Sequence, residues 1–155
     1  MLATVLIQEA AVSGLRLGPA RLDFVFILTL SWGILKGGNA AMGWAFGAGL
    51  LMDLVSGGPL GPFTISLPIV AFAAASTSEH LSYANPLTSF PVASLLFILY
   101  DITQLTVLRL LGHNLPWAES LALITLPSAL LNGVAAIPAY MILSRLYQRE
   151  TGERK

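Results

Sequence analysis

The chain contains no cysteine and very few charged residues. Without cysteine, disulfide bonds, thiol catalysis and cysteine-based metal sites are excluded. Charged residues make up 10% of the 155 residues, whereas a soluble domain carries about a quarter. The formal net charge is zero, and no cluster of Lys and Arg marks a nucleic-acid-binding surface, so we expect no nucleic-acid partner.

The chain contains three long runs without charged residues. Residues 54–78, 81–100 and 120–144 contain no Asp, Glu, Lys or Arg. Each run reaches the length of about 20 residues that an α-helix needs to cross a bilayer. Hydrophobic residues make up 55% of the chain. The composition therefore predicts a small integral membrane protein.

Glycine, proline and polar residues divide the chain into six hydrophobic segments, because such residues end helices and form turns. We predict an all-α fold, an integral membrane bundle of about six transmembrane helices. The expected segments are Leu2–Leu15, Arg21–Leu35, Ala40–Val55, Pro62 to about Ser76, Val92–Leu111 and Glu119–Leu146. Residues 1–147 would form one transmembrane domain, and residues 148–155 a polar cytoplasmic tail.

Basic residues suggest the orientation of the bundle. Arg145, Arg149, Arg154 and Lys155 gather near the C-terminus, and cytoplasmic loops and tails carry an excess of Lys and Arg. We therefore predict a multi-pass protein of the plasma membrane with a cytoplasmic C-terminus. With six spans, Lys36 would also be cytoplasmic, and Arg21 and Arg109 would lie outside.

The segment from Gly43 to Gly61 carries the most specific pattern. Gly43 and Gly47 share one side of the third predicted helix, and Gly49 and Asp53 share another. Small residues let helix backbones approach closely in a membrane. We favour packing within the molecule as the reason for these glycines. The alternative is a docking face for a membrane helix of a partner protein.

Asp53 lies one turn before the predicted end of that helix, where a carboxylate opposes the helix dipole. We expect it to accept backbone N–H bonds, either from the Gly57-Gly58 turn or from the start of the next helix near Gly61. The alternative is an ion or proton site. No second acidic residue lies nearby in the sequence, and we therefore favour the cap.

Three polar residues, Asp101, Gln104 and Asn132, lie in the fifth and sixth predicted spans. A charge near the middle of a span costs about 2.5–3.5 kcal/mol even on lenient scales, so Asp101 should face the interior of the bundle. We predict that Asp101 and Asn132 hydrogen-bond across the two helices. The pattern identifies no basic partner for Asp101. Polar contact between helices and a ligand or proton site both remain open.

The sequence shows no nucleophile–base pair, metal-ligand signature or phosphate-binding loop. His80 and His113 lie in predicted loops, far from each other in sequence. We therefore expect no catalytic activity, no cofactor and no metal site.

The segment Gly43-x-x-x-Gly47-x-Gly49-Leu-Leu-x-Asp53 through Gly57-Gly58-Pro59-Leu60-Gly61 resembles the signature of the rod-shape-determining MreD family. Other parts of the chain also resemble this family. They are Gln8, Arg21-Leu-Asp23, Tyr100-Asp101 and Pro127-Ser-Ala-Leu-Leu-Asn132. The resemblance therefore extends, in order, over nearly the whole chain.

The resemblance implies a bacterial inner-membrane subunit of the cell-elongation machinery, without catalytic activity. It implies a fold similar to the substrate-binding subunits of energy-coupling-factor transporters. The implied partners are MreC, a single-span membrane protein, and through it the MreB filament and the RodA–transpeptidase synthase. Membrane lipids are further expected partners. Whether the protein forms a homo-oligomer is left open. The signature positions would be Gly43, Gly47, Gly49, Asp53, Gly57, Gly58, Pro59, Leu60 and Gly61.

A second function stays open beside this scaffold role. A vitamin-type substrate-binding subunit of an uptake transporter would use Asp101, Gln104 and Asn132 as ligand groups. A small proton-coupled transporter is a third interpretation.

Overall fold

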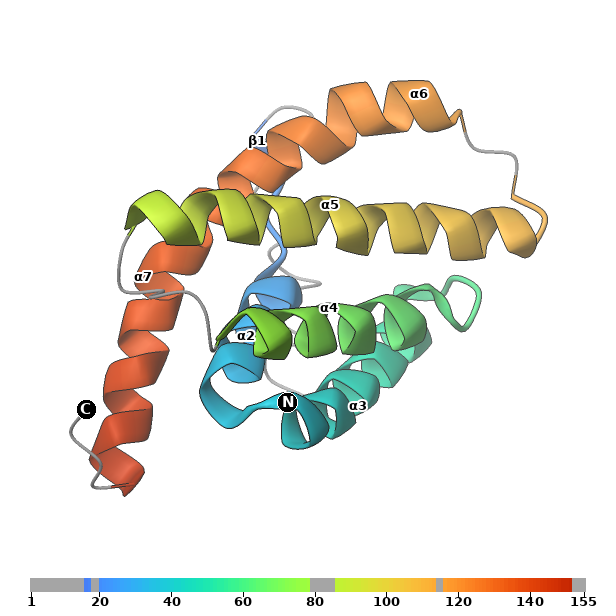
Figure 1. The fold of residues 1–155 in the computed structure, drawn as a ribbon. Helices are drawn as coiled ribbons and strands as arrows, with labels where there is room; N and C mark the ends of the chain where they lie inside the picture. The colour runs from blue at the N-terminus through green and yellow to red at the C-terminus, as the bar shows by residue number, and fades with distance from the viewer. Residues whose placement is uncertain (1–15, 18–19, 79–85, 114–115, 152–155) are drawn as a thin grey trace.

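The computed structural model describes residues 16–17, 20–78, 86–113 and 116–151, and these residues are almost entirely helical (Figure 1). The elements are β1 (Arg16–Leu17), β2 (Ala20–Arg21), α2 (Phe24–Lys36), α3 (Gly38–Ser56), α4 (Pro62–Ser78), α5 (Pro86–Leu110), α6 (Trp117–Ser120), η1 (Leu121–Thr125) and α7 (Leu126–Thr151). The predicted all-α fold is confirmed. The first predicted segment, Leu2–Leu15, lies outside the described residues.

Helix α4 is the central helix of the bundle, because it packs against α2, α3 and α5. Helices α5 and α7 pack against each other, and α7 also contacts α2. Helix α3 packs on α4 and, to a smaller extent, on α2, so it lies at the edge of the described bundle (Figure 1). The short antiparallel pair β1–β2 leads into α2.

Two helices in the described part of the chain are long and apolar enough to cross a membrane. They are Thr88–Leu110 and the continuous helix Trp117–Arg149. The second has 33 residues, or about 50 Å at 1.5 Å per residue, more than the hydrocarbon core of about 30 Å. Its C-terminal part turns away from the direction of α6 (Figure 1), and Pro138 lies inside it.

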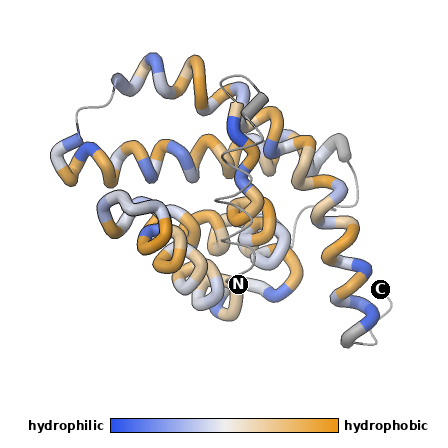
Figure 2. Tube along the Cα trace, turned by 180° about the vertical axis from the view of Figure 1, so that it is seen from behind, coloured by the Kyte–Doolittle hydropathy of each residue, from blue (hydrophilic) through white to orange (hydrophobic). Residues whose placement is uncertain are grey.

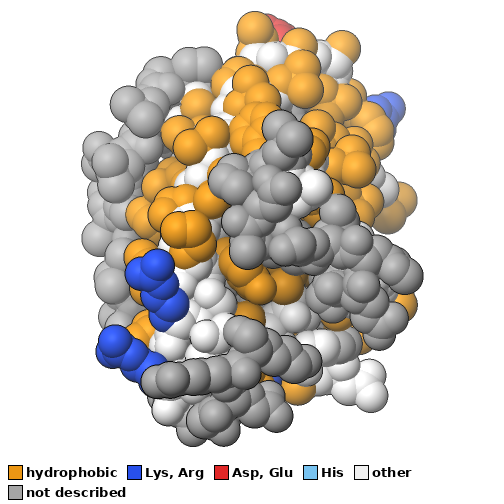
Figure 3. Space-filling model, turned by 60° about the vertical axis from the view of Figure 1, so that its left-hand side comes forward, with side chains coloured by type: hydrophobic (Ala, Val, Ile, Leu, Met, Phe, Trp, Pro, Cys, Tyr) orange, Lys and Arg blue, Asp and Glu red, His pale blue; other side chains and the backbone are white. Residues whose placement is uncertain are grey.

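Hydrophobic residues cover much of the length of every long helix, while the C-terminal end of α7 is hydrophilic (Figure 2). Large apolar side chains also face outward, as Figure 3 shows for one side of the molecule. Phe46 on α3 and Leu95 on α5, for example, are 53% and 65% exposed. Apolar surface of this extent is typical of proteins that contact lipid or partner proteins.

The interior between α2 and α5 is filled by aromatic rings. Phe26, Phe97 and Tyr100 are fully buried. The ring centroids of Phe26 and Phe97 lie 5.0 Å apart in an edge-to-face arrangement, and those of Phe26 and Tyr100 lie 5.3 Å apart. This cluster fixes α2 against α5 next to the polar groups described below.

Glycines allow three close approaches between helices. A Cβ atom built on Gly49 would lie 2.5 Å from the carbonyl oxygen of Phe63 at the start of α4. At Gly33 it would lie 2.9 Å from the carbonyl oxygen of Ala71, also on α4. At Gly133 it would overlap the Ser94 hydroxyl on α5. The sequence pattern identified Gly49, but not Gly33 or Gly133.

Gly43 behaves differently from Gly49. It is exposed, and a Cβ atom built on it would meet no described residue within 4 Å. The described helices leave this side of α3 uncovered, because only one of its two glycine-bearing sides meets α4. Packing within the molecule therefore stays a prediction for Gly43.

Gly49→Ala and Gly43→Ala form a matched pair for testing this packing. Gly49→Ala would force the backbone of α4 away from α3, and we expect a loss of about 1–3 kcal/mol, as for other overpacked sites. Gly43→Ala should be neutral or stabilising by up to about 1 kcal/mol, because alanine favours helix. Thermal unfolding of both variants in the same detergent measures the difference. Equal unfolding midpoints would contradict the close approach at Gly49.

Candidate functional site

The carboxylate of Asp53 joins the end of α3 to the start of α4. Its Oδ2 atom accepts hydrogen bonds from the backbone N–H groups of Gly61 and Thr64, both at 2.9 Å, and from the Thr64 hydroxyl. Its Oδ1 atom accepts from the backbone N–H of Phe63 at 3.0 Å. These N–H groups begin α4 and have no partner within that helix.

Asp53 therefore caps the following helix. Of the two backbone partners expected for it, the start of the next helix near Gly61 is the one it binds. The Gly57-Gly58 turn is not its partner, since the N–H of Gly58 points to the Ser56 hydroxyl, 3.4 Å away. Gly57 has φ 66° and Gly61 has φ 127°, values that glycine adopts without strain. The turn thus brings the α4 N-terminus back to a carboxylate that is only 1% exposed.

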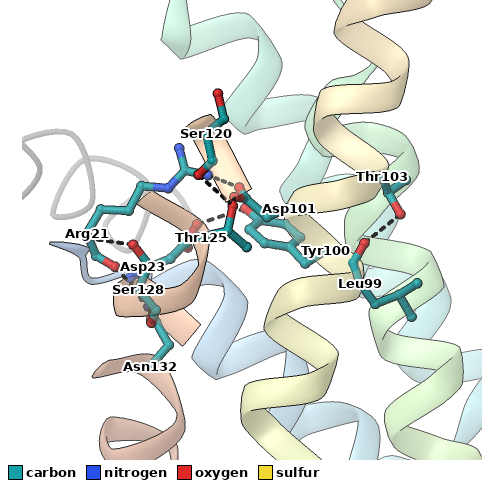
Figure 4. A network of polar contacts seen from close by, with 10 residues as sticks. All are labelled: Arg21, Asp23, Leu99, Tyr100, Asp101, Thr103, Ser120, Thr125, Ser128 and Asn132. Atoms are coloured by element: carbon teal, nitrogen blue, oxygen red, sulfur yellow. Dashed lines mark hydrogen bonds and ion pairs between the residues drawn. The ribbon is translucent and has the colours of Figure 1, made fainter. Parts of the chain in front are cut away.

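A second polar cluster joins the extended segment before α2 to α5 and α7 (Figure 4). The side-chain oxygen of Asn132 accepts from the backbone N–H of Asp23 at 2.8 Å. Its amide nitrogen donates to the backbone carbonyls of Arg21 and Ser128, both at 2.8 Å. The Ser128 hydroxyl accepts from the backbone N–H of Arg21 at 3.0 Å. Side chains of α7 therefore bind the backbone of residues 21–23 directly.

Asp23 in turn holds the start of α2. One carboxylate oxygen accepts from the backbone N–H of Phe26 at 2.9 Å, which makes Asp23 the N-cap of that helix. The other oxygen accepts from the Tyr100 hydroxyl on α5 at 2.8 Å. The buried carboxylate of Asp23 thus ties α2 to α5.

Asp101, one residue beyond Tyr100, forms an ion pair with the guanidinium of Arg21 and accepts a hydrogen bond from the Thr125 hydroxyl. The predicted hydrogen bond between Asp101 and Asn132 is therefore wrong for the described structure. Both residues instead bind Arg21. Asp101 binds the guanidinium of Arg21, and the side-chain amide of Asn132 binds the backbone carbonyl of Arg21. The side chain of Asp101 is 6% exposed, whereas that of Arg21 is 41% exposed.

Thr125 reaches Asp101 from an irregular stretch of helix. Residues Leu121–Thr125 form a π-helix, and the N–H of Leu126 donates to the carbonyl of Leu121, five residues earlier. Pro127 follows directly and has no N–H to donate to the carbonyl of Leu123, which removes one α-helical bond at this point. Short π-helical segments occur often at functional sites.

The structure does not join Gln104 to this cluster. This residue is 5% exposed, and its amide nitrogen has no hydrogen-bond acceptor among the described residues. In the described part of the chain, no group of three or more His, Asp or Glu residues could hold a metal ion.

The sequence matches the family of rod shape-determining protein MreD over residues 3–150, nearly the whole chain. The chain belongs to the MreD family. Its members are membrane proteins that determine cell shape, and the two long apolar helices agree with a place in the membrane. No curated protein and no solved structure matches the chain, so similarity to energy-coupling-factor subunits remains a prediction.

The segments that resemble the MreD family meet in the two polar clusters. Gly49, Asp53 and Gly61 form the joint between α3 and α4. Arg21-Leu-Asp23, Tyr100-Asp101 and Pro127–Asn132, far apart in sequence, form the second cluster around residues 21–23. In this MreD-family chain, the polar side chains of these motifs therefore bind parts of the chain itself.

The Asp53 cap can be tested by substitution. Asp53→Ala leaves the first N–H groups of α4 without an acceptor, and we expect a loss of about 1–3 kcal/mol. Asp53→Asn keeps one acceptor oxygen and should lose less. Thr64→Val is the control, because it removes only the hydroxyl donor and leaves the backbone bonds. Thermal unfolding in detergent ranks the three variants, and an alanine variant as stable as wild type would rule out the cap.

The ion pair predicts an asymmetry between its two members. Arg21→Gln leaves a buried carboxylate without a cation, whereas Asp101→Asn leaves an arginine that solvent or headgroups can reach. Removing one partner of a buried pair costs up to about 3–5 kcal/mol, so Arg21→Gln should lose the larger share of stability. The double variant should lose less than the sum of the singles. Additive losses in thermal unfolding would show that the two side chains do not interact.

Proposed function

We propose that this MreD-family protein is a non-enzymatic scaffold subunit of the bacterial inner membrane. In this role it binds an MreC-type single-span membrane protein and supports rod-shape maintenance and peptidoglycan elongation. Its link to the MreB filament and to the RodA–transpeptidase synthase would run through that partner. Family membership supports the general role, and the use of the polar side chains supports the scaffold.

The observation that favours a scaffold is that Asp53, Asp23, Asn132 and Asp101 all bind other parts of the chain. Both carboxylate oxygens of Asp53 and of Asp23 accept hydrogen bonds that begin helices or join them. The amide of Asn132 is fully used by backbone groups, and Asp101 is paired with Arg21. The vitamin-type transporter alternative would use Asp101, Gln104 and Asn132 as ligand groups. Asp101 and Asn132 are engaged within the chain, and only the amide nitrogen of Gln104 has no partner among the described residues.

The outer side of α3 is the surface best suited to a partner helix. Gly43, Phe46, Gly47, Leu50 and Leu54 follow one another at helical spacing on this side, away from α4. Phe46 and Leu54 are 53% and 61% exposed, and no described residue lies within 4 Å of a Cβ atom built on Gly43. A glycine flanked by large apolar side chains lets a second helix approach closely in a membrane.

A cytoplasmic C-terminus is supported by the position of the basic residues. Lys36 at the end of α2 lies 4.6 Å from the ring centroid of Tyr147 on α7 and 5.6 Å from that of Trp32. Lys36 therefore lies at the same end of the molecule as the exposed Arg145 and Arg149. Lys and Arg gathered at one end are typical of the cytoplasmic side, whereas Trp and Tyr are enriched at both membrane interfaces.

Gly43→Leu tests the proposed docking side. The variant should fold normally, because no described residue lies within 4 Å of a Cβ atom at this position, but the leucine would keep a partner helix from the α3 backbone. We expect MreC-type partner capture from native membranes to fall by about tenfold, equal to about 1.4 kcal/mol. Thr106→Leu, on an exposed position of α5, is the control for a leucine placed on another exposed helix side. Undiminished capture by the Gly43 variant would rule out this side of α3.

A further inference from the structure

The part of α7 after Pro138 continues past the point where a straight span would leave the membrane. A hydrocarbon core of about 30 Å takes up about 20 residues of helix. The continuous helix from Trp117 to Arg149 has 33 residues, so a span that begins at Trp117 would end near Pro138. A proline inside a helix removes one N–H donor and bends the helix. After Pro138 the helix does turn away from the direction of α6 (Figure 1).

One side of this part of α7 is exposed, and we call it the outer side of the α7 end. It consists of Ile142, Arg145, Leu146 and Arg149. These residues are three or four positions apart, or adjacent, so they share one side of the helix. Ile142 and Leu146 are 59% and 52% exposed, and both arginines are exposed. The opposite side is less exposed and contains Tyr147, whose ring contacts Lys36 of α2.

The two arginines of the outer side have no acidic partner among the described residues, where the ion pair joins Arg21 to Asp101. Lys36 lies at the same level of the molecule, because its ammonium group is 4.6 Å from the ring centroid of Tyr147. Tyr147 lies midway between the two arginines in sequence, about 3 Å along the helix axis from each. Three cations therefore lie at one level, on two sides of α7, and this level favours a layer of negative charge.

The apolar side chains of the outer side show what kind of anion covers it. Free phosphate, or an acidic loop in water, would leave Ile142 and Leu146 exposed to water. At a membrane interface, acyl chains cover such side chains, while arginines extend their guanidinium groups to the headgroups. In Figure 3, which brings the side of α7 forward, Lys and Arg side chains lie beside hydrophobic surface. A lipid therefore fits both parts of this side.

We propose that the outer side of the α7 end binds anionic phospholipids of the cytoplasmic leaflet. The lipid phosphates accept hydrogen bonds from Arg145 and Arg149, and the acyl chains cover Ile142 and Leu146. A zwitterionic lipid brings its own cation close to the arginines, so a lipid of net negative charge, such as phosphatidylglycerol, binds better. The choice of leaflet rests on the proposed cytoplasmic C-terminus. The binding itself does not depend on the proposed partner of α3.

Fluorescence quenching in vesicles tests the proposal, because the chain has no cysteine and accepts a single label. Leu146→Cys, labelled with bimane, reports the lipids beside the two arginines. We expect doxyl-labelled phosphatidylglycerol to quench the bimane more strongly than doxyl-labelled phosphatidylcholine does. Adding Arg145→Gln or Arg149→Gln should lower this preference by about fivefold for each arginine removed.

Arg109→Gln is the control, because it removes an exposed arginine at the opposite end of the bundle, near the turn at Gly61. It should retain the preference for phosphatidylglycerol. The vesicles contain no partner protein and have the same lipids in both leaflets, so the result is independent of the proposed scaffold role and of the orientation.

Three outcomes would overturn the proposal. Equal quenching by the two lipids, with both arginines present, would mean that this side contacts lipid without recognising its charge. Quenching by neither lipid would mean that the side faces water or protein. A preference that survives the removal of both Arg145 and Arg149 would assign the recognition of charge to another part of the molecule.

Discussion

The side-chain amide of Asn132 binds the backbone of Arg21 and Asp23, and much of the described bundle depends on this contact. Once residues 21–23 are held against α7, Asp23 is in place to cap α2 and to receive the Tyr100 hydroxyl, while Arg21 reaches Asp101. Three helices are thereby joined through one short extended segment. Because lipid offers no hydrogen bonds, backbone groups outside a helix must find partners within the protein. Here the side chains of Asn132 and Ser128 supply those partners for residues 21–23.

The joint between α3 and α4 solves the same problem with Asp53. Here too a side chain from one helix accepts the free N–H groups at the start of another. Helix α4 connects this joint to the polar cluster around residues 21–23. Gly49 brings α3 onto the start of α4, and Gly33 brings α2 onto its middle. A bundle held together at this joint and at the cluster around residues 21–23 presents its outer surfaces, among them the exposed side of α3, in a defined geometry. That is the property a scaffold needs.

The all-α fold, the apolar helices and the Asp53 cap could be predicted from the sequence, because each rests on local patterns. The pairing of Arg21 with Asp101 could not, since 80 residues separate them and a basic residue before a short span indicates an interface rather than an interior partner. Gly33 and Gly133 are single glycines without a repeat, so nothing in the sequence marked them as contacts. The pair Gly43 and Gly47 shows that one side of α3 is small, but a pair of glycines does not show which neighbour meets that side.

The central claim is that Asn132 holds the start of α2 in place, and hydrogen–deuterium exchange tests it most directly. In lipid nanodiscs, peptides covering residues 20–36 should be protected in the wild-type protein, because the N–H groups of Arg21, Asp23 and Phe26 are hydrogen-bonded. In Asn132→Leu we predict exchange at these positions that is faster by about tenfold or more, with unchanged protection across α3 and the start of α4. Unaltered exchange at residues 21–26 in that variant would contradict the account.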